Sequence, residues 1–80
     1  MTDLTDQTVT GSTCMFFRRG SRGVVLKNKC DVSMVFAVEQ LSNSSSGAVP
    51  TVVHVRVDAN SEKFHNAGGS ENVISVGIGS

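Results

Sequence analysis

The chain has no tryptophan and no tyrosine, and four phenylalanines make up the 5% of its 80 residues that are aromatic. A single proline excludes a collagen-like repeat. Two cysteines are too few for a disulfide-dense scaffold or for a zinc site built from four cysteines. No apolar run approaches the roughly 18 residues that a membrane-spanning helix needs. These absences leave one small globular domain, for which we expect no membrane span.

Valine supplies most of the apolar side chains that remain, with thirteen copies. β-Branched side chains fit a pleated sheet better than a helix, and the chain shows no helical periodicity longer than one turn. Its short apolar runs are separated by glycine, serine and asparagine. The sequence therefore predicts an all-β fold, a small antiparallel β-sandwich or open barrel of five or six strands. A chain of this length buries only about 60–65% of its unfolded surface, so we expect it to depend on a disulfide, a partner or self-association.

The composition changes near Cys14, which divides the chain into two parts. Residues 1–13 hold five threonines and few apolar side chains, which is typical of a flexible polar arm, whereas residues 14–80 form a single all-β domain. The arm has neither a basic region nor an apolar run, so we expect no signal peptide in the chain as given. The compartment stays open between the cytoplasm and, for a mature form, a virion or the extracellular space.

The first two apolar runs flank a glycine-rich turn and predict a β-hairpin over residues 14–30. A turn at Gly20-Ser21 would set every apolar residue of one strand opposite an apolar residue of the other. A three-residue loop, 21–23, would instead set Cys14 opposite Cys30 and permit a disulfide. The two registers place side chains on opposite faces, so they exclude each other. Both stay open here, as do a bridge and two buried thiols.

Three further strands are predicted from alternation. Residues 32–40 form a central strand, since both of its faces carry apolar residues, and residues 51–58 form a half-exposed strand. Residues 41–50 are predicted to be a loop closed by a proline, and the stretch that follows residue 58 is predicted to be irregular, anchored by Phe64, with one helical turn. The last strand is expected to point three aliphatic side chains inward: Ile74, Val76 and Ile78.

Charge is unevenly placed, although seven basic and seven acidic residues give a net charge of zero. Residues 15–30 contain five basic residues and no acid, a charge of +5, so the other residues carry two basic and seven acidic residues, a charge of −5. Such a basic hairpin suits an acidic partner, a second copy of the chain, or a polyanion. The predicted partner-binding residues lie on this hairpin and on the polar face of residues 51–58: Arg18, Arg19, Arg22, His54, Arg56 and Asp58.

The sequence carries no recognisable catalytic or cofactor motif. Its serines have no nucleophile-elbow context, its two glycines at 68–69 precede no phosphate-binding helix, and its histidines lack metal-ligand spacing. We therefore expect no enzyme, no cofactor and no metal. The hypothesis is a non-enzymatic β-domain that acts by protein–protein interaction and self-assembles, as a virion component, secreted effector or inhibitor would, with sheet extension at the C-terminal strand. The alternative is binding of nucleic acid or another polyanion through the basic hairpin 15–30.

Overall fold

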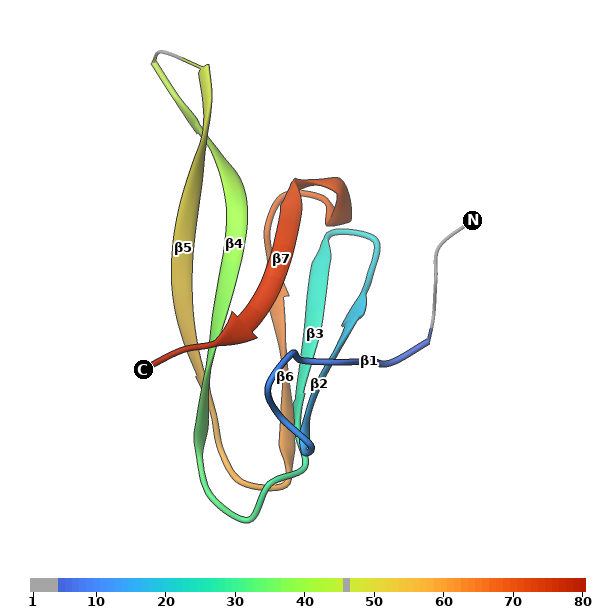
Figure 1. Ribbon diagram of the computed structural model, residues 1–80. Helices are drawn as coiled ribbons and strands as arrows, with labels where there is room; N and C mark the ends of the chain where they lie inside the picture. Colours follow the sequence, from blue (N-terminus) through green and yellow to red (C-terminus); the bar gives the residue numbers. More distant parts are fainter. Residues whose placement is uncertain (1–4, 46) are drawn as a thin grey trace.

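The computed structural model describes residues 5–45 and 47–80, with the backbone alone at residues 43 and 44. Seven strands and one short 3-10 helix follow one another along this part of the chain (Figure 1): β1 (Gln7–Thr8), β2 (Met15–Arg19), β3 (Gly23–Asn28), β4 (Met34–Ser44), β5 (Gly47–Val57), β6 (Ser61–Asn66), η1 (Ser70–Asn72) and β7 (Val73–Ile78). The strands form two antiparallel sheets, one in the order β1-β2-β3-β6 and the other in the order β5-β4-β7. The predicted all-β antiparallel fold is confirmed as a sandwich rather than an open barrel, with seven strands in the described residues where five or six were predicted.

The core lies between the two sheets and is mainly aliphatic. The largest fully buried side chains are those of Phe36, Met15 and Leu26, and six valines, Phe17 and Cys30 complete the cluster. One of them, Val9, belongs to the segment for which the sequence predicts a flexible arm. The nitrogen of Val9 donates a hydrogen bond to the oxygen of Met15, and β1 pairs with β2 directly before it. The described part of that segment is therefore fastened to the first sheet.

The β2–β3 hairpin has a register that neither prediction contains. Its loop is Ser21-Arg22, because the nitrogen of Gly20 bonds to the oxygen of Gly23 and Phe17 lies opposite Leu26. This register differs by two residues from the one predicted by matching apolar residues, so the predicted cross-strand partners are wrong. β6 approaches the hairpin closely beside its turn. A Cβ on Gly23 would come within 2.0 Å of the oxygen of His65, so only glycine fits there.

Residues 41–50 are not a loop, contrary to the prediction. β4 and β5 continue as a two-stranded ribbon that projects beyond the rest of the sandwich (Figure 1), with Ser44 opposite Gly47. Proline was expected to end the strand because it lacks a backbone N–H. β5 is an edge strand, however, and Pro50 pairs with Leu41 at a position where its nitrogen faces away from β4. A proline is tolerated at such a position.

The segment after β5 is also more regular than predicted, since residues 61–66 form the edge strand β6. Asn60, in the turn before it, takes the left-handed conformation (φ 55°), which asparagine tolerates. Phe64 does not anchor the core: it is 49% exposed on the outer face of the first sheet. The one short helix, η1, comes later than the predicted helical turn.

β7 follows its predicted inward pattern only in part. Val76 is buried as expected, and Ile78 lies opposite the buried Phe36 yet is 45% exposed at the end of the sheet. Ile74 is also 45% exposed, because a bulge in the pairing with β4 puts Val73 into the core in its place. A bulge changes which side chains point inward, and alternation alone cannot reveal it. The predicted central position of the strand over residues 32–40 is right: β4 lies between β5 and β7.

Candidate functional site

One end of the sandwich is held together by Asn28, the buried polar side chain of β3. Its Nδ2 donates to the carbonyl oxygens of Val32, Val57 and Asp58 at 2.9, 3.0 and 3.1 Å, and its Oδ1 accepts from the nitrogen of Cys30 at 2.9 Å. These groups lie in the two connections that cross between the sheets, β3–β4 and β5–β6. Asn28 therefore fixes the C-terminal end of β5.

A disulfide joins the same end to the start of β2. Cys14 and Cys30 are bridged, with their Cα atoms 5.1 Å apart. From the sequence, such a bridge is expected only in the hairpin register that sets the two cysteines directly opposite each other. In the structure Cys14 lies opposite Lys29, whose nitrogen bonds to its oxygen at 2.8 Å, and the bridge runs diagonally to the next residue. Closing a loop of this size stabilises a fold by about 3 kcal/mol in the chain-entropy model.

The other end of the sandwich is held by Arg19, the last residue of β2. Its Nη1 donates to the oxygens of Ser70 and Val73 at 3.1 and 2.6 Å, and its Nη2 lies 3.4 Å from the oxygen of Ile74. The guanidinium group thus binds the carbonyl groups of η1 and of the start of β7. The guanidinium donors of Arg19 are therefore engaged within the chain, which makes Arg19 a structural residue rather than a free partner-binding residue as predicted together with Arg18 and Arg22.

The predicted partner-binding residues fall into separate places rather than one surface. Arg18 lies on the outer face of the β1-β2-β3-β6 sheet, opposite Val25, and Arg22 is exposed in the β2–β3 turn. His54 and Arg56 lie on β5, with both side chains exposed on the outer face of the other sheet. Asp58, exposed just after β5, accepts a bond from Asn28 through its backbone oxygen. The structure therefore brings the two predicted groups to opposite sides of the sandwich.

The outer face of the first sheet carries a cluster of cations beside an aromatic ring. Lys29 Nζ lies 5.1 Å from the centre of the Phe16 ring, a cation–π contact. Lys27 Nζ donates to Asp6 Oδ2 at 3.0 Å and lies 4.0 Å from Glu62 Oε2. The hydrogen bond from Lys27 holds the pKa of Asp6 below its ordinary value. The two carboxylates thus offset part of the positive charge of this face.

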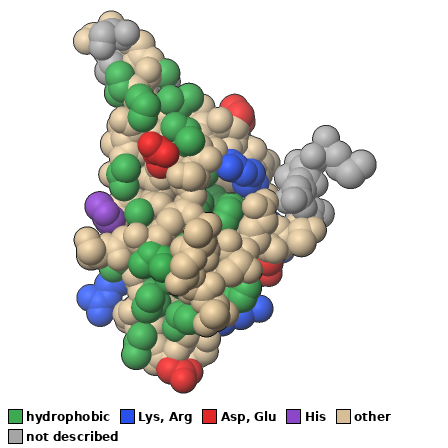
Figure 2. Space-filling model, viewed as in Figure 1, with side chains coloured by type: hydrophobic (Ala, Val, Ile, Leu, Met, Phe, Trp, Pro, Cys, Tyr) green, Lys and Arg blue, Asp and Glu red, His purple; other side chains and the backbone are tan. Residues whose placement is uncertain are grey.

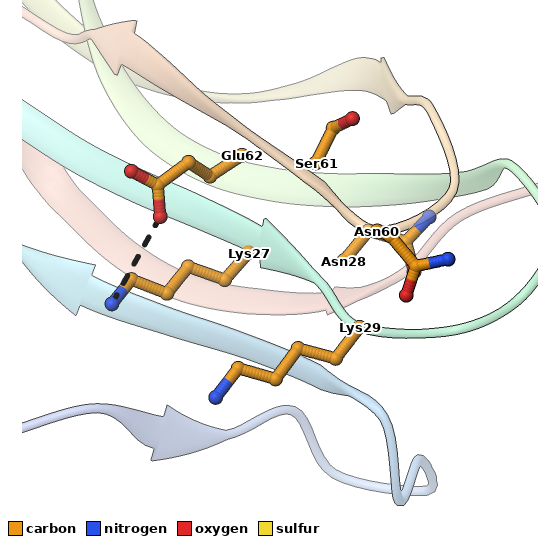
Figure 3. Close-up of a pocket in the computed structure, with 6 residues that line it drawn as sticks. All are labelled: Lys27, Asn28, Lys29, Asn60, Ser61 and Glu62. Carbon is orange, nitrogen blue, oxygen red and sulfur yellow. Dashed lines mark ion pairs between the residues drawn. The ribbon is translucent and has the colours of Figure 1, made fainter.

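A pocket of about 320 Å³ opens at the Asn28 end of this face (Figure 3). In Figure 3, Lys27 and Lys29 extend side by side along the sheet, away from the turn that carries Asn60. All of its lining residues are polar or charged: Lys27, Asn28, Lys29, Asn60, Ser61 and Glu62. The ion pair of Lys27 with Glu62 crosses part of it, so the pocket presents one lysine, Lys29, that has no carboxylate partner within 4.0 Å among the described residues.

The edge of β5 is obstructed at two points. β4 and β5 meet in a tight turn with Ser44 opposite Gly47, so the even-numbered residues of β5 point their backbone groups away from β4. At Pro50 this free edge has no N–H to offer. At Arg56 the carbonyl oxygen already accepts a bond from Lys63 Nζ at 2.9 Å. Proline and lysine are the residues by which natural sheets block their edges.

The edge of β7 is covered only at its start, where Arg19 binds the oxygens of Val73 and Ile74; from Val76 onward it has no such protection among the described residues. The nitrogen of Gly79 bonds to the oxygen of Val35 at 2.7 Å, which fixes the alternation: Gly77 points its backbone groups toward β4, whereas Val76 and Ile78 point theirs outward. No hydrogen bond to these outward groups occurs within residues 5–45 and 47–80. The half-exposed side chains of Ile74 and Ile78 flank them.

The segments that form this edge contain no charged residue, although Arg19 binds the start of β7 and Glu39 lies beside Ser75. Residues 72–80 contain no Asp, Glu, Lys, Arg or His, and neither do residues 8–13, of which Gly11 lies next to Ile78. Figure 2 shows an acidic and a basic side chain within the upper half of this view, and other charged side chains toward its margins. The spaced glycines of the C-terminal strand indicated this surface in the sequence. The roles of Asn28 and Arg19 left no signal beyond their residue types, because their acceptors, apart from Val32, are backbone carbonyls 29 or more residues away.

The comparisons with known proteins return no relatives. No protein-family model matches the chain, and neither a curated protein nor a solved structure matches it. In the part of the chain that the structure describes, no helix has the length and apolar character needed to cross a membrane. The fold and the site define the protein only as a class: a small disulfide-linked β-sandwich with one blocked and one open edge in its three-stranded sheet.

Proposed function

We propose that this protein is a non-enzymatic interaction module that binds another polypeptide by adding a strand to the edge of β7. The observation that carries the proposal is the pair of outward-pointing backbone groups at Val76 and Ile78, flanked by half-exposed aliphatic side chains. In strand addition, main-chain hydrogen bonds supply affinity and side-chain pockets supply specificity. The blocked edge of β5 supports the choice of β7 as the binding edge.

A peptide with the sequence of residues 72–80 tests this proposal, because it has the length and alternation of the strand that would be added. We expect a fluorescein-labelled form to bind the protein in a polarisation titration, and a scrambled form of the same composition to bind at least tenfold more weakly. Ile78→Lys, which places a charge on the binding edge, should abolish peptide binding. Equal binding of the two peptides, or binding unaffected by Ile78→Lys, would refute strand addition at β7.

The second candidate function is binding of a polyanion on the outer face of the first sheet. It is favoured by the contact of Lys29 with Phe16 and by the exposed Phe64, because aromatic rings beside cations bind single-stranded nucleic acids. It is weakened by Arg19 and Lys27, whose side chains are engaged within the chain. A salt titration with a labelled single-stranded oligonucleotide tests it. Absence of binding at low ionic strength would eliminate this candidate, since phosphate contacts are strongest there.

A further inference from the structure

We infer that the strand added at β7 is the β7 of a second copy of this chain, related by a twofold axis that passes beside Gly77. This inference rests on the proposed strand addition and names its partner. In this arrangement Val76 of each copy faces Ile78 of the other. The outward N–H and C=O groups of Val76 in one copy then bond to those of Ile78 in the other. The twofold axis gives two such pairs, and each pair makes two main-chain hydrogen bonds. The two three-stranded sheets become one continuous sheet of six strands.

The alternation of β7 makes the strand complementary to itself. A hydrogen-bonded pair needs outward-pointing groups on both strands, and Val76 and Ile78 supply them two residues apart on each copy. On the core side of the sheet, the half-exposed Ile78 of one copy lies beside Val76 of the other and gains apolar cover. On the outer side, Gly77 faces Gly77, and a Cβ built on this residue meets nothing within 4 Å. No side chain on the axis opposes close approach.

The charge distribution favours a second copy over a charged partner. Two identical surfaces repel each other if they carry net charge, and neither β7 nor its neighbouring residues 8–13 contain a charged residue. The nearest charges, Arg19 at Val73 and Ile74 and Glu39 at Ser75, have opposite signs and are both bonded within the chain, so an acidic or basic partner would find no free charge of one sign beside Val76 and Ile78. The opposite side of the sandwich, where β5 and β6 lie, carries Arg56, Asp58, Glu62 and Lys63. Its charges and blocked backbone groups make it unsuited to pairing with itself.

Cysteine crosslinking tests the register. Because the native cysteines are bridged, Gly77→Cys introduces one free thiol, and on the axis the two new cysteines form a non-hydrogen-bonded pair with Cα atoms about 4.5 Å apart. That distance suits a disulfide. The matched control is Ser75→Cys on the same exposed strand, where the axis separates the two thiols by about 13 Å. We expect Gly77→Cys to form covalent dimers at least tenfold faster than Ser75→Cys under mild oxidation.

Light scattering on the protein without engineered cysteines, with its Cys14–Cys30 disulfide intact, tests the interface independently. The wild type should approach twice the monomer mass as its concentration rises to the millimolar range. Ile78→Lys should weaken dimerisation at least tenfold, whereas Val52→Lys, an exposed change on the blocked β5 edge, should leave it unchanged. Circular dichroism of each variant verifies folding.

The outcomes separate the inference from the proposed function. If the 72–80 peptide binds but the protein remains monomeric and the two cysteine variants crosslink equally slowly, the inference is overturned and strand addition stands. If the protein forms dimers that Val52→Lys disrupts and Ile78→Lys does not, the second copy binds elsewhere and the inference is overturned. If the peptide also fails to bind, both are overturned.

Discussion

β5 and β7 are the two edges of the same three-stranded sheet, yet they present different backbone surfaces. β5 is the longer strand, with eleven residues against six, but its free edge lacks an N–H at Pro50 and has its Arg56 carbonyl occupied by Lys63. β7 leaves the outward groups of Val76 and Ile78 without a partner among the described residues. The length of an edge strand is therefore a poor guide to its capacity for pairing; what decides is which backbone groups remain available.

The two strands are also anchored by different chemistry. Asn28, fully buried and neutral, binds the oxygens of Val57 and Asp58 at the end of β5. Arg19, half-buried and charged, binds the oxygens of Val73 and Ile74 at the start of β7. Each anchor is a single side chain from the other sheet. Disruption of either should loosen one edge strand more than the other, which makes the comparison open to experiment.

Unblocking β5 should have the largest effect of the changes considered. In the double variant Pro50→Val and Lys63→Met, the first change restores the missing N–H and the second frees the Arg56 carbonyl while keeping an apolar stem. With both edges open, pairing no longer closes after two copies, and we expect open-ended assemblies of many copies. Light scattering measures the mass. Adding Ile78→Lys to the double variant should limit assembly to dimers, and a wild-type mass for the double variant would show that β5 is not blocked by these residues.

Asn28→Ala should produce the largest loss of stability. It removes four hydrogen bonds and leaves buried carbonyl groups and the nitrogen of Cys30 without their partners, at a cost of about 1–3 kcal/mol for each unsatisfied group. Partial relaxation would reduce the total to about 4 kcal/mol. Urea unfolding of the disulfide-bonded protein measures it. Asn72→Ala, which removes one bond to the oxygen of Ala67, is the matched control, and a loss no larger than that of the control would contradict the anchoring role.

Arg19→Ala should lower the free energy of unfolding less, by about 2 kcal/mol. The side chain is only half-buried, so water can bind part of the carbonyl groups that lose their partner. The amides of β7 should then exchange hydrogen faster than those of β5, which the change does not touch. Arg19→Lys should recover part of the loss, since lysine keeps the charge but not the planar fork of donors. Arg18→Ala, next to it on the outer face, should change stability by no more than about 0.5 kcal/mol. Uniform acceleration of exchange in β5 and β7 would argue against local anchoring.

The sequence predicted those parts of the fold that depend on local alternation. Alternation placed Phe36, Val38 and Val57 on the inward faces correctly, but Val32, expected to share the face of Phe36, is 61% exposed because it lies before β4 begins. The predicted hairpin register was wrong, because matching apolar residues within the hairpin leaves out the pairing of β3 with β6, which lies more than 30 residues away along the chain. Residues 41–50 were wrong because proline forbids a central strand but not an edge strand, and strand order cannot be deduced from one sequence.

The candidate site was predicted less completely than the fold. Glycine spacing pointed to the C-terminal strand as an extension surface, but the bulge that exposes Ile74 depends on the pairing with β4 and could not be foreseen. The concentration of positive charge in residues 15–30 suggested one basic surface. The structure instead uses Arg19 to bind carbonyl groups and Lys27 to pair with Asp6, because those partners come from distant segments. Charge counted along a sequence does not show which charges remain available.

The smallest effect is expected at Asp6, where the N-terminal segment is fastened to Lys27 of the first sheet. The bond from Lys27 lowers the pKa of Asp6 in the folded state, so this carboxylate stabilises the fold at pH values above its ordinary pKa of about 4. That contribution is lost as the pH falls through the depressed pKa. Asp6→Asn should therefore be slightly less stable than the wild type at pH 7, and the two should converge near pH 2 in urea unfolding. Profiles that stay parallel over this range would show that the ion pair does not fasten the segment, which would then be held by its other contacts, among them Val9 in the core and the short β1 ladder.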